Sequence, residues 1–264
     1  MYNFDVETPS SVADAVAALS KEDAQALGGG QTLIPTLKQR LASPSSLVSL
    51  SGIADIKGVC VTDDGKLSVG GATTHATVAR EAAASFAGLA GLASHIGDPA
   101  VRNRGTIGGS LANNDPAACY PAAALATGAH IITNNREIAA DDYFQGMFTT
   151  DLEEGEIITE VRFPIPEASN YQKFLQPASR FALVGVFVAK FADGVRVAVT
   201  GASNEGVFRW TEAEAALSGN FSADALDGLT VSDDDMINDL HGTAAYRAHL
   251  IGVMTKRAVA AASA

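Results

Sequence analysis

The stretch RNRGTIGGSLANNDPAA, from Arg102 to Ala118, places a glycine pair between a threonine and a serine and then enters an Asn-Asn-Asp-Pro turn. A second glycine-rich stretch, LGGGQTLIPTLKQRL, runs from Leu27 to Leu41. Each is expected to join a strand or an extended segment to a helix. Glycine adopts positive φ and lets backbone N–H groups approach a ligand. Two such turns on adjacent units could hold a pyrophosphate from both sides, although a single turn of this kind more often has a purely structural role.

Other motifs narrow the chemistry. Thr32, Thr106 and Ser110 add hydroxyls to the two glycine turns. The chain has no G-x-x-x-x-G-K-[ST] phosphate loop, and GGGQTL lacks the G-x-G-x-x-G spacing of a dinucleotide-binding turn. The five histidines form no metal-binding pattern, no G-x-S-x-G elbow is present, and SDDDMIND is typical of a solvated segment. We therefore expect a bound cofactor to carry the chemistry.

Composition limits the class of protein and its partners. Of the 264 residues, 47% are apolar, which is enough for a sizeable core, and the net charge is −12. A negative surface repels phosphate backbones, so nucleic acid is not an expected partner. The two cysteines, Cys60 and Cys119, are too few to hold an iron–sulfur cluster and are expected to be buried free thiols. Without a signal-like N-terminus or a membrane-length apolar segment, we expect a cytoplasmic protein.

Hydrophobic periodicity predicts two small α/β units in the first two thirds of the chain. The first is expected to contain a helix over residues 12–20, a strand over 24–27, a helix over 33–41 and a strand over 45–50. The second repeats the strand–turn–helix pattern from about residue 57. Pro164 and Pro166 interrupt the chain, which places a boundary near Glu167.

The remaining third predicts an antiparallel meander with helices. Strands are expected over 171–176, 182–191, 195–203 and 206–210, with hairpin turns at residues 193–194 and 204–206. Helices are expected over 211–219 and 243–262. In the second helix, Tyr246, Leu250, Val253 and Met254 form an apolar stripe that should face the core.

Three motifs and the C-terminal segment carry a resemblance to a known family. They are LGGGQTLIPTLKQRL, HIGDPAVRNRGTIGGSLANNDPAA, YQKFLQPASRFALVGVFVA and the C-terminal AAYRAHLIGVMTKRAV. In this order and spacing they resemble the FAD-binding medium subunit of the xanthine dehydrogenase family, in particular the carbon monoxide dehydrogenase type. The resemblance covers essentially the whole chain.

The resemblance implies an α+β fold in two domains. Residues 1–168 would form a PCMH-type FAD-binding domain made of two α/β subdomains, at about 1–56 and 57–168. Residues 169–264 would form a C-terminal domain with a three-stranded antiparallel sheet and helices.

The resemblance also implies which residues contact FAD, and it assigns neither a catalytic residue nor a metal ligand to this chain. The implied cofactor-binding residues are Gly28, Gly29, Gly30, Gln31, Thr32, Thr106, Ile107, Gly108, Gly109, Ser110, Asp115, Cys119, Ile158, Lys173 and Phe181. The first loop would bind the pyrophosphate mostly through backbone amides, and the second would approach the pyrophosphate and the flavin. The Phe181 ring could lie against the flavin, or it could be an apolar contact of the C-terminal core.

Four positions near the second loop have more than one candidate role. Relatives often carry an acid at the position of Cys119, so a contact made by that acid would be lost here or made by the backbone. Asp115 is expected to cap the turn at Pro116, with a cofactor contact as the alternative. Arg102 and Arg104 could bind phosphate, but we expect them to hold neighbouring carbonyls or to meet a partner.

The resemblance implies an electron-transfer subunit of a molybdenum-containing hydroxylase complex. Its partners would be a molybdenum-binding large subunit with molybdopterin and a [2Fe-2S] small subunit. The alternatives are a stand-alone FAD-dependent oxidoreductase, which would need a base over the flavin, and a cofactor-free assembly scaffold.

Overall fold

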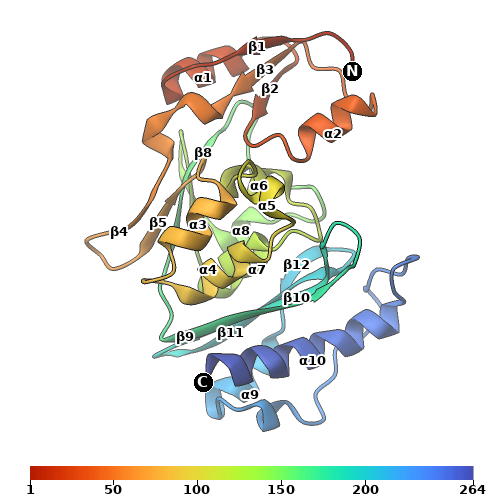
Figure 1. The fold of residues 1–264 in the computed structure, drawn as a ribbon. Coiled ribbons are helices and arrows are strands. Elements are labelled where there is room, and N and C mark those ends of the chain that lie inside the picture. The colour runs from red at the N-terminus through yellow and green to blue at the C-terminus, as the bar shows by residue number, and fades with distance from the viewer. Residues whose placement is uncertain (264) are drawn as a thin grey trace.

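Three β-sheets follow one another along the molecule, with helices packed between and outside them (Figure 1). This computed structural model describes residues 1–263, so the last residue of the predicted C-terminal domain, Ala264, lies outside the described residues. None of the helices within residues 1–263 combines the length and the apolar character needed to cross a membrane.

The first unit is a small parallel sheet with one helix at each end. Its elements are β1 (Asp5–Glu7), α1 (Val12–Leu19), β2 (Ala24–Leu27), α2 (Leu33–Lys38) and β3 (Ser46–Ser49), followed by 3-10 turns at Leu50–Gly52 and Ala54–Ile56. The strand order is β1-β3-β2. Ser11 caps α1, because its hydroxyl accepts a hydrogen bond from the Asp14 N–H at 3.1 Å. The predicted α/β unit is therefore present, with a second helix shorter than the expected 33–41.

The second unit is a five-stranded sheet with the order β4-β5-β8-β6-β7. Its strands are β4 (Val59–Val61), β5 (Leu67–Gly70), β6 (His130–Thr133), β7 (Glu137–Ala139) and β8 (Ile158–Phe163). Its helices are α3 (His75–Glu81), α4 (Ala87–Ser94), α5 (Pro99–Arg102), α6 (Ile107–Asn113), α7 (Tyr120–Thr127) and α8 (Ala140–Tyr143). Every neighbouring pair is antiparallel, so this unit mixes helices with an antiparallel sheet.

The third unit contains a four-stranded antiparallel sheet, which corrects the three strands implied by the resemblance. The order is β12-β11-β10-β9, with β9 (Ala168–Leu175), β10 (Ala182–Phe191), β11 (Gly194–Ser203) and β12 (Gly206–Arg209). The tight turn after Ser203 returns the chain along the free edge of β11, where Arg209 pairs with Ala198. The helices are α9 (Thr211–Gly219) and α10 (Ala244–Ala262), with a 3-10 turn at Ala223–Leu226.

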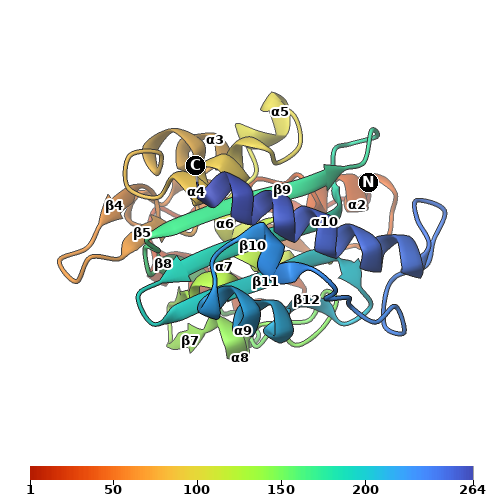
Figure 2. The ribbon, with the colours of Figure 1, turned by 90° about the horizontal axis from the view of Figure 1, so that it is seen from below.

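This third sheet is buried on both faces because helices cover each side (Figures 1 and 2). Side chains of a strand alternate between its faces. Along β10, Phe187 and Ala189 join the core shared with α4 and α7, whereas Val184, Val186 and Val188 join the core under α9 and α10. The sheet therefore connects the second unit to the C-terminal helices through continuous apolar packing.

Helix α10 buries an arginine along with its apolar stripe. Leu250 and Met254 are buried as predicted, but Tyr246 is 41% exposed. Arg247 is only 2% exposed, and its guanidinium donates to the Leu183 and Gly201 carbonyls at 2.8 and 2.7 Å. It also pairs with Asp239 at 2.8 Å. This contact fixes the helix to two strands of the sheet.

We predict that Arg247→Met destabilises the protein by about 2–4 kcal/mol, because two buried carbonyls lose their donor and cannot recover it from water. Arg257→Met is the matched control, since Arg257 lies on the exposed side of the same helix and should change stability by less than about 0.5 kcal/mol. Urea unfolding measures both. Equal losses of stability in the two variants would show that the Arg247 hydrogen bonds to the sheet do not stabilise the protein.

Candidate cofactor-binding site

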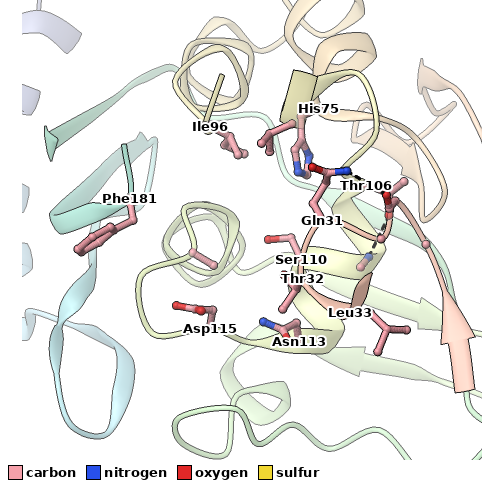
Figure 3. Close-up of a pocket in the computed structure, with 18 of the residues that line it drawn as sticks. Gln31, Thr32, Leu33, His75, Ile96, Thr106, Ser110, Asn113, Asp115 and Phe181 are labelled. Atoms are coloured by element: carbon pink, nitrogen blue, oxygen red, sulfur yellow. Dashed lines mark hydrogen bonds between the residues drawn. The ribbon is translucent and has the colours of Figure 1, made fainter. Parts of the chain in front are cut away.

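A cavity of about 540 Å³ lies where the three units meet (Figure 3). Its wall includes most of the residues predicted to bind a cofactor. These are Gly28, Gly29, Gly30, Gln31, Thr32, Thr106, Gly109, Ser110, Asp115, Cys119, Lys173 and Phe181. Segments more than a hundred residues apart in the sequence therefore share one pocket.

The first glycine loop joins β2 to α2 and presents free backbone donors. Within residues 1–263, the N–H groups of Gly29, Gly30, Gln31 and Thr32 donate to no protein acceptor. Gly30 has φ of 71°, a conformation that favours glycine. Because these N–H groups belong to residues that line the cavity, the loop is suited to bind an anionic group.

The second glycine loop differs from the expectation, because its backbone amides are already used. The Ile107 and Gly108 N–H groups donate to the Thr73 and Gly71 carbonyls at 3.1 and 2.8 Å. The Gly109 N–H donates to the Thr106 hydroxyl, which caps α6, at 3.2 Å. The loop therefore offers the cavity the surface of Gly109 and the Ser110 hydroxyl rather than a row of free amides.

The two loops are in direct backbone contact. A Cβ added to Gly29 would lie 2.0 Å from the Arg104 carbonyl oxygen and 2.5 Å from the Cα of Gly105. A Cβ on Gly28 would lie 2.9 Å from the Thr106 hydroxyl. Both distances to Gly29 involve backbone, which cannot rotate away, so a side chain there would separate the loops.

The third unit holds the far end of the second loop. The Thr200 hydroxyl on β11 lies 2.9 and 2.7 Å from the Pro116 and Ala118 carbonyl oxygens, which share its single hydrogen. The Gly201 N–H also donates to the Pro116 carbonyl, at 2.7 Å. Asp115 caps the turn as predicted, because its carboxylate accepts from the Ala117 N–H at 2.8 Å. The loop is thus fixed at both ends.

Lys173 enters the cavity from β9 beside Cys119. Its ammonium donates to the His95 carbonyl at 3.0 Å and to the Cys119 sulfur at 3.5 Å. Cys119 is a buried free thiol, as predicted. The same prediction is wrong for Cys60, which is exposed because β4 is an edge strand.

Phe181 forms the wall opposite the glycine loops (Figure 3). Its ring meets the His241 ring edge-on, with centroids 5.2 Å apart. Phe181 is half-buried and lines the cavity, so this wall offers an aromatic residue to a planar ligand.

The two arginines before the second loop differ in role. Arg102 donates to the Ile96 and Gly97 carbonyls at 3.1 and 2.9 Å, which holds the segment preceding α5. This is the structural role that we expected. Arg104 has an exposed side chain, and its carbonyl meets the first loop.

Three predicted cofactor contacts lie outside the cavity wall. Ile107 is fully buried in the main core, and Ile158 on β8 is 5% exposed in the same core. Gly108 packs against Gly71, where an added Cβ would lie 2.7 Å from the Gly71 carbonyl oxygen. Their assignment to cofactor contacts stays a prediction.

His75 lines the cavity but was not predicted as a site residue. It is the first residue of α3, is 5% exposed, and its Nδ1 finds no hydrogen-bond partner within residues 1–263. Burial, with a smaller contribution from Arg102, lowers its pKa to about 4, so the ring is neutral at neutral pH. The sequence contained one signal for this position, because Thr74 is a helix-capping residue directly before His75. The proximity of His75 to the glycine loops, however, depends on the fold.

Other lining residues also escaped the sequence analysis. They include Ile96, Gly97, Val101, Asn113, Ala118 and Arg180. Several lie in the quoted HIGDPAVRNRG and NNDPAA segments. The sequence therefore predicted that these segments belong to the site, but it did not predict these residues as lining it. Within residues 1–263, no group of three His, Cys, Asp or Glu side chains is arranged to hold a metal ion.

Comparison with known proteins identifies the family. A family model described as "FAD binding domain in molybdopterin dehydrogenase" matches residues 2–166. The carbon monoxide dehydrogenase medium chain of Afipia carboxidovorans is 34% identical, over 99% of this chain and 97% of that protein. This chain belongs to the FAD-binding medium subunits of the molybdenum hydroxylase family. FAD is thus the cofactor of this medium subunit, which is an oxidoreductase component.

Further relatives of the medium subunit differ in the reaction that their names describe. The nicotine 6-hydroxylase medium subunit of Paenarthrobacter nicotinovorans is 33% identical, over 97% of this chain and 96% of that one. Among solved structures, CO dehydrogenase of Oligotropha carboxidovorans has a TM-score of 0.88 at 33% identity, covering 98% of this chain and 97% of that one. Quinoline 2-oxidoreductase of Pseudomonas putida 86 has a TM-score of 0.87 at 28% identity, covering 98% and 96%.

We predict that Gly29→Ala destabilises the medium subunit by about 1–3 kcal/mol, because the new methyl group overpacks two backbone segments. The variant should also lose flavin during purification. Gly91→Ala is the control: Gly91 lies within α4 with open space around it, so alanine should stabilise the helix by about 0.5–1 kcal/mol. Thermal unfolding and the flavin absorbance measure both. Full flavin retention by Gly29→Ala would contradict the loop contact.

We predict that His75 makes the medium subunit less stable as the pH falls from about 6.5 to about 4. At His75 the unfolded chain binds a proton in this window and the folded chain does not. Lowering the pH through the window therefore reduces the free energy of unfolding by about 3 kcal/mol through this residue. His75→Leu should flatten the stability profile in this window, whereas His95→Gln, at an exposed histidine, should not. Parallel profiles of wild type and His75→Leu would contradict the burial of a neutral ring.

Proposed function

We propose that FAD lies in the cavity between the two glycine loops, with its pyrophosphate at the first loop. The observation that supports this most strongly is the run of free N–H groups from Gly29 to Thr32 beside a cavity lined by both polar and apolar residues. Backbone amides bind phosphate oxygens without requiring a lysine. The wall formed by Phe181, opposite these loops, suits the flavin end.

We further propose the two-domain arrangement implied by the sequence. Residues 1–168 would form the FAD-binding domain, with subdomains at about 1–56 and 57–168, and residues 169–264 would form the C-terminal domain. Lys173 and Phe181 support a role for the C-terminal domain in closing the pocket, because both line the cavity from its sheet and the following loop.

We propose that the chain is the electron-transfer subunit of a molybdenum hydroxylase complex. It would accept electrons from a [2Fe-2S] small subunit and pass them to an external acceptor, while a molybdenum-binding large subunit oxidises the substrate. Relatives named as medium chains of dehydrogenases and hydroxylases support this assignment. FAD supplies the redox chemistry when bound. The residues of this chain bind it, orient it and limit the access of water.

The proposal is tested by purifying the chain alone and together with candidate molybdenum and iron–sulfur subunits from the same organism. The chain alone should carry flavin that is released on denaturation, and it should not turn over a substrate. Addition of the molybdenum and iron–sulfur subunits should give substrate-dependent reduction of the bound flavin.

Three outcomes would contradict the proposal in different ways. A colourless chain that cannot be reconstituted with FAD would favour an assembly scaffold. Turnover by the flavin-loaded chain alone would favour a stand-alone oxidoreductase. Flavin that stays oxidised in a complete complex with substrate would exclude the electron-transfer role while leaving FAD binding intact.

A further inference from the structure

Phe148 is an exposed aromatic residue in a backbone conformation that bulky residues rarely adopt. It is 59% exposed, and its φ is 56°, in the left-handed region. Its loop neighbours Phe144 and Leu152 pack against the main core, whereas Phe148 packs against none of the three apolar cores within residues 1–263. The fold therefore keeps a strained backbone without burying the ring, and strain of this kind is characteristic of functional sites.

The loop that presents Phe148 is held by Asn114. The Asn114 side chain donates to the Gly146 and Thr149 carbonyls at 2.8 and 2.9 Å. The Phe148 N–H donates in turn to the Asn114 carbonyl at 3.0 Å. Asn114 is only 3% exposed, so water competes little for these hydrogen bonds. The aromatic residue is thus ordered in advance, which lowers the entropy cost of binding a partner.

The same asparagine connects the loop to the cavity wall. Asn114 ends α6, and its two neighbours in the sequence, Asn113 and Asp115, both line the cavity (Figure 3). Phe148 is therefore hydrogen-bonded to a residue that lies between two lining residues. A protein that covers Phe148 would lie beside the proposed FAD site, which suits a protein that exchanges electrons with the flavin.

Unpaired carboxylates lie next to this loop. The Gln145 side chain donates to the backbone carbonyl of Asp142. A Cβ added to Gly206 would lie 3.5 Å from the Gly146 carbonyl carbon, so the turn that carries Glu205 also approaches the loop. Asp142 and Glu205 are exposed, and neither forms an ion pair within residues 1–263. A partner with basic side chains would complement them.

The apolar part of this surface is small. It consists of Phe148 and the half-buried Met147. Permanent subunit interfaces are typically large and more apolar, whereas transient redox encounters bury little area. Opposite charges raise the association rate of such encounters, and the chain carries a net charge of −12. The loop therefore fits a transient electron-transfer partner better than a permanent subunit.

We propose that Phe148 is the docking anchor for a protein electron carrier that offers an apolar pocket edged by Lys and Arg and accepts electrons from the bound flavin. This inference rests on the proposed function and names the class of its external acceptor. A carrier of this class takes one electron. Two carriers therefore dock in turn for each reduced FAD, each is reduced by one electron, and the proton on flavin N5 passes to water.

The test uses mitochondrial cytochrome c, a basic haem protein that takes one electron, and the full chain. Calorimetry measures binding of ferric cytochrome c to the oxidised chain at low and high salt. Phe148→Gly removes the ring and relieves the backbone, because glycine adopts positive φ freely. Phe148→Tyr keeps an aromatic ring. Val61→Ser is the matched control, since Val61 is a 50% exposed apolar residue on the edge strand β4.

We expect Phe148→Gly to weaken cytochrome c binding about tenfold or more, as the loss of an aromatic anchor does, while the thermal unfolding temperature does not fall. Phe148→Tyr and Val61→Ser should bind as wild type does. The double variant Asp142→Asn with Glu205→Gln should bind more weakly and depend less on salt. If Phe148→Gly failed to fold, Phe148→Ser would provide the same comparison.

Re-oxidation of the reduced flavin separates docking from flavin chemistry. At low carrier concentration, cytochrome c should re-oxidise the Phe148→Gly variant about tenfold more slowly than wild type, in line with its weaker binding. A small neutral quinone needs no protein docking surface and should re-oxidise both at the same rate. Stopped-flow absorbance of the flavin measures both reactions.

Equal cytochrome c binding by wild type and Phe148→Gly would overturn the inference, as would no measurable binding to the wild-type chain. Failure of Phe148→Gly to assemble with the molybdenum and iron–sulfur subunits would also overturn it, because the loop would then belong to a permanent interface. Phe148-dependent binding to a chain that cannot take up FAD would instead contradict the proposed function and leave the docking surface in place.

Discussion

The close approach of two glycine loops is the constraint on which the rest of the site depends. Gly29 lies against the backbone at Arg104 and Gly105 with no room for a Cβ. This contact joins the small parallel sheet to the antiparallel sheet of the second unit. It also aligns the free amides of the first loop with the cavity beside Ser110. A side chain at Gly29 would therefore disturb both the junction between the units and the binding surface.

The second loop has a mainly structural task that its sequence did not reveal. Its N–H groups are bonded to the turn between β5 and α3 and to the Thr106 hydroxyl, while Thr200 and Gly201 hold the Pro116 end. Arg247 in turn donates to the Gly201 carbonyl. A continuous set of hydrogen bonds thus runs from the cavity to the C-terminal helix. Because such polar groups are buried, each lost partner carries a desolvation cost.

Electrostatics in the cavity differ from those of the whole chain. The net charge of −12 would repel an anionic cofactor at long range. Salt, however, screens the interaction between exposed charges that lie more than about 10 Å apart. At contact distance the cofactor would meet free amides, the Lys173 ammonium and a neutral His75. In the proposed site, these short-range donors would act on the cofactor at contact distance, where the screened field of the surface is weak.

The sequence by itself determined the family, the α+β class, most element positions and the two glycine loops, because local periodicity, turn residues and motif order depend only on neighbours along the chain. It did not determine the antiparallel pairing of the second sheet or the exposure of Cys60 on an edge strand, whereas the strand pattern had predicted all four strands of the third sheet. The role of His75, the internal use of the second loop's amides and the Lys173–Cys119 contact were decided only by the tertiary structure. Each depends on atoms brought together from distant segments, and such distances leave no pattern in a single sequence.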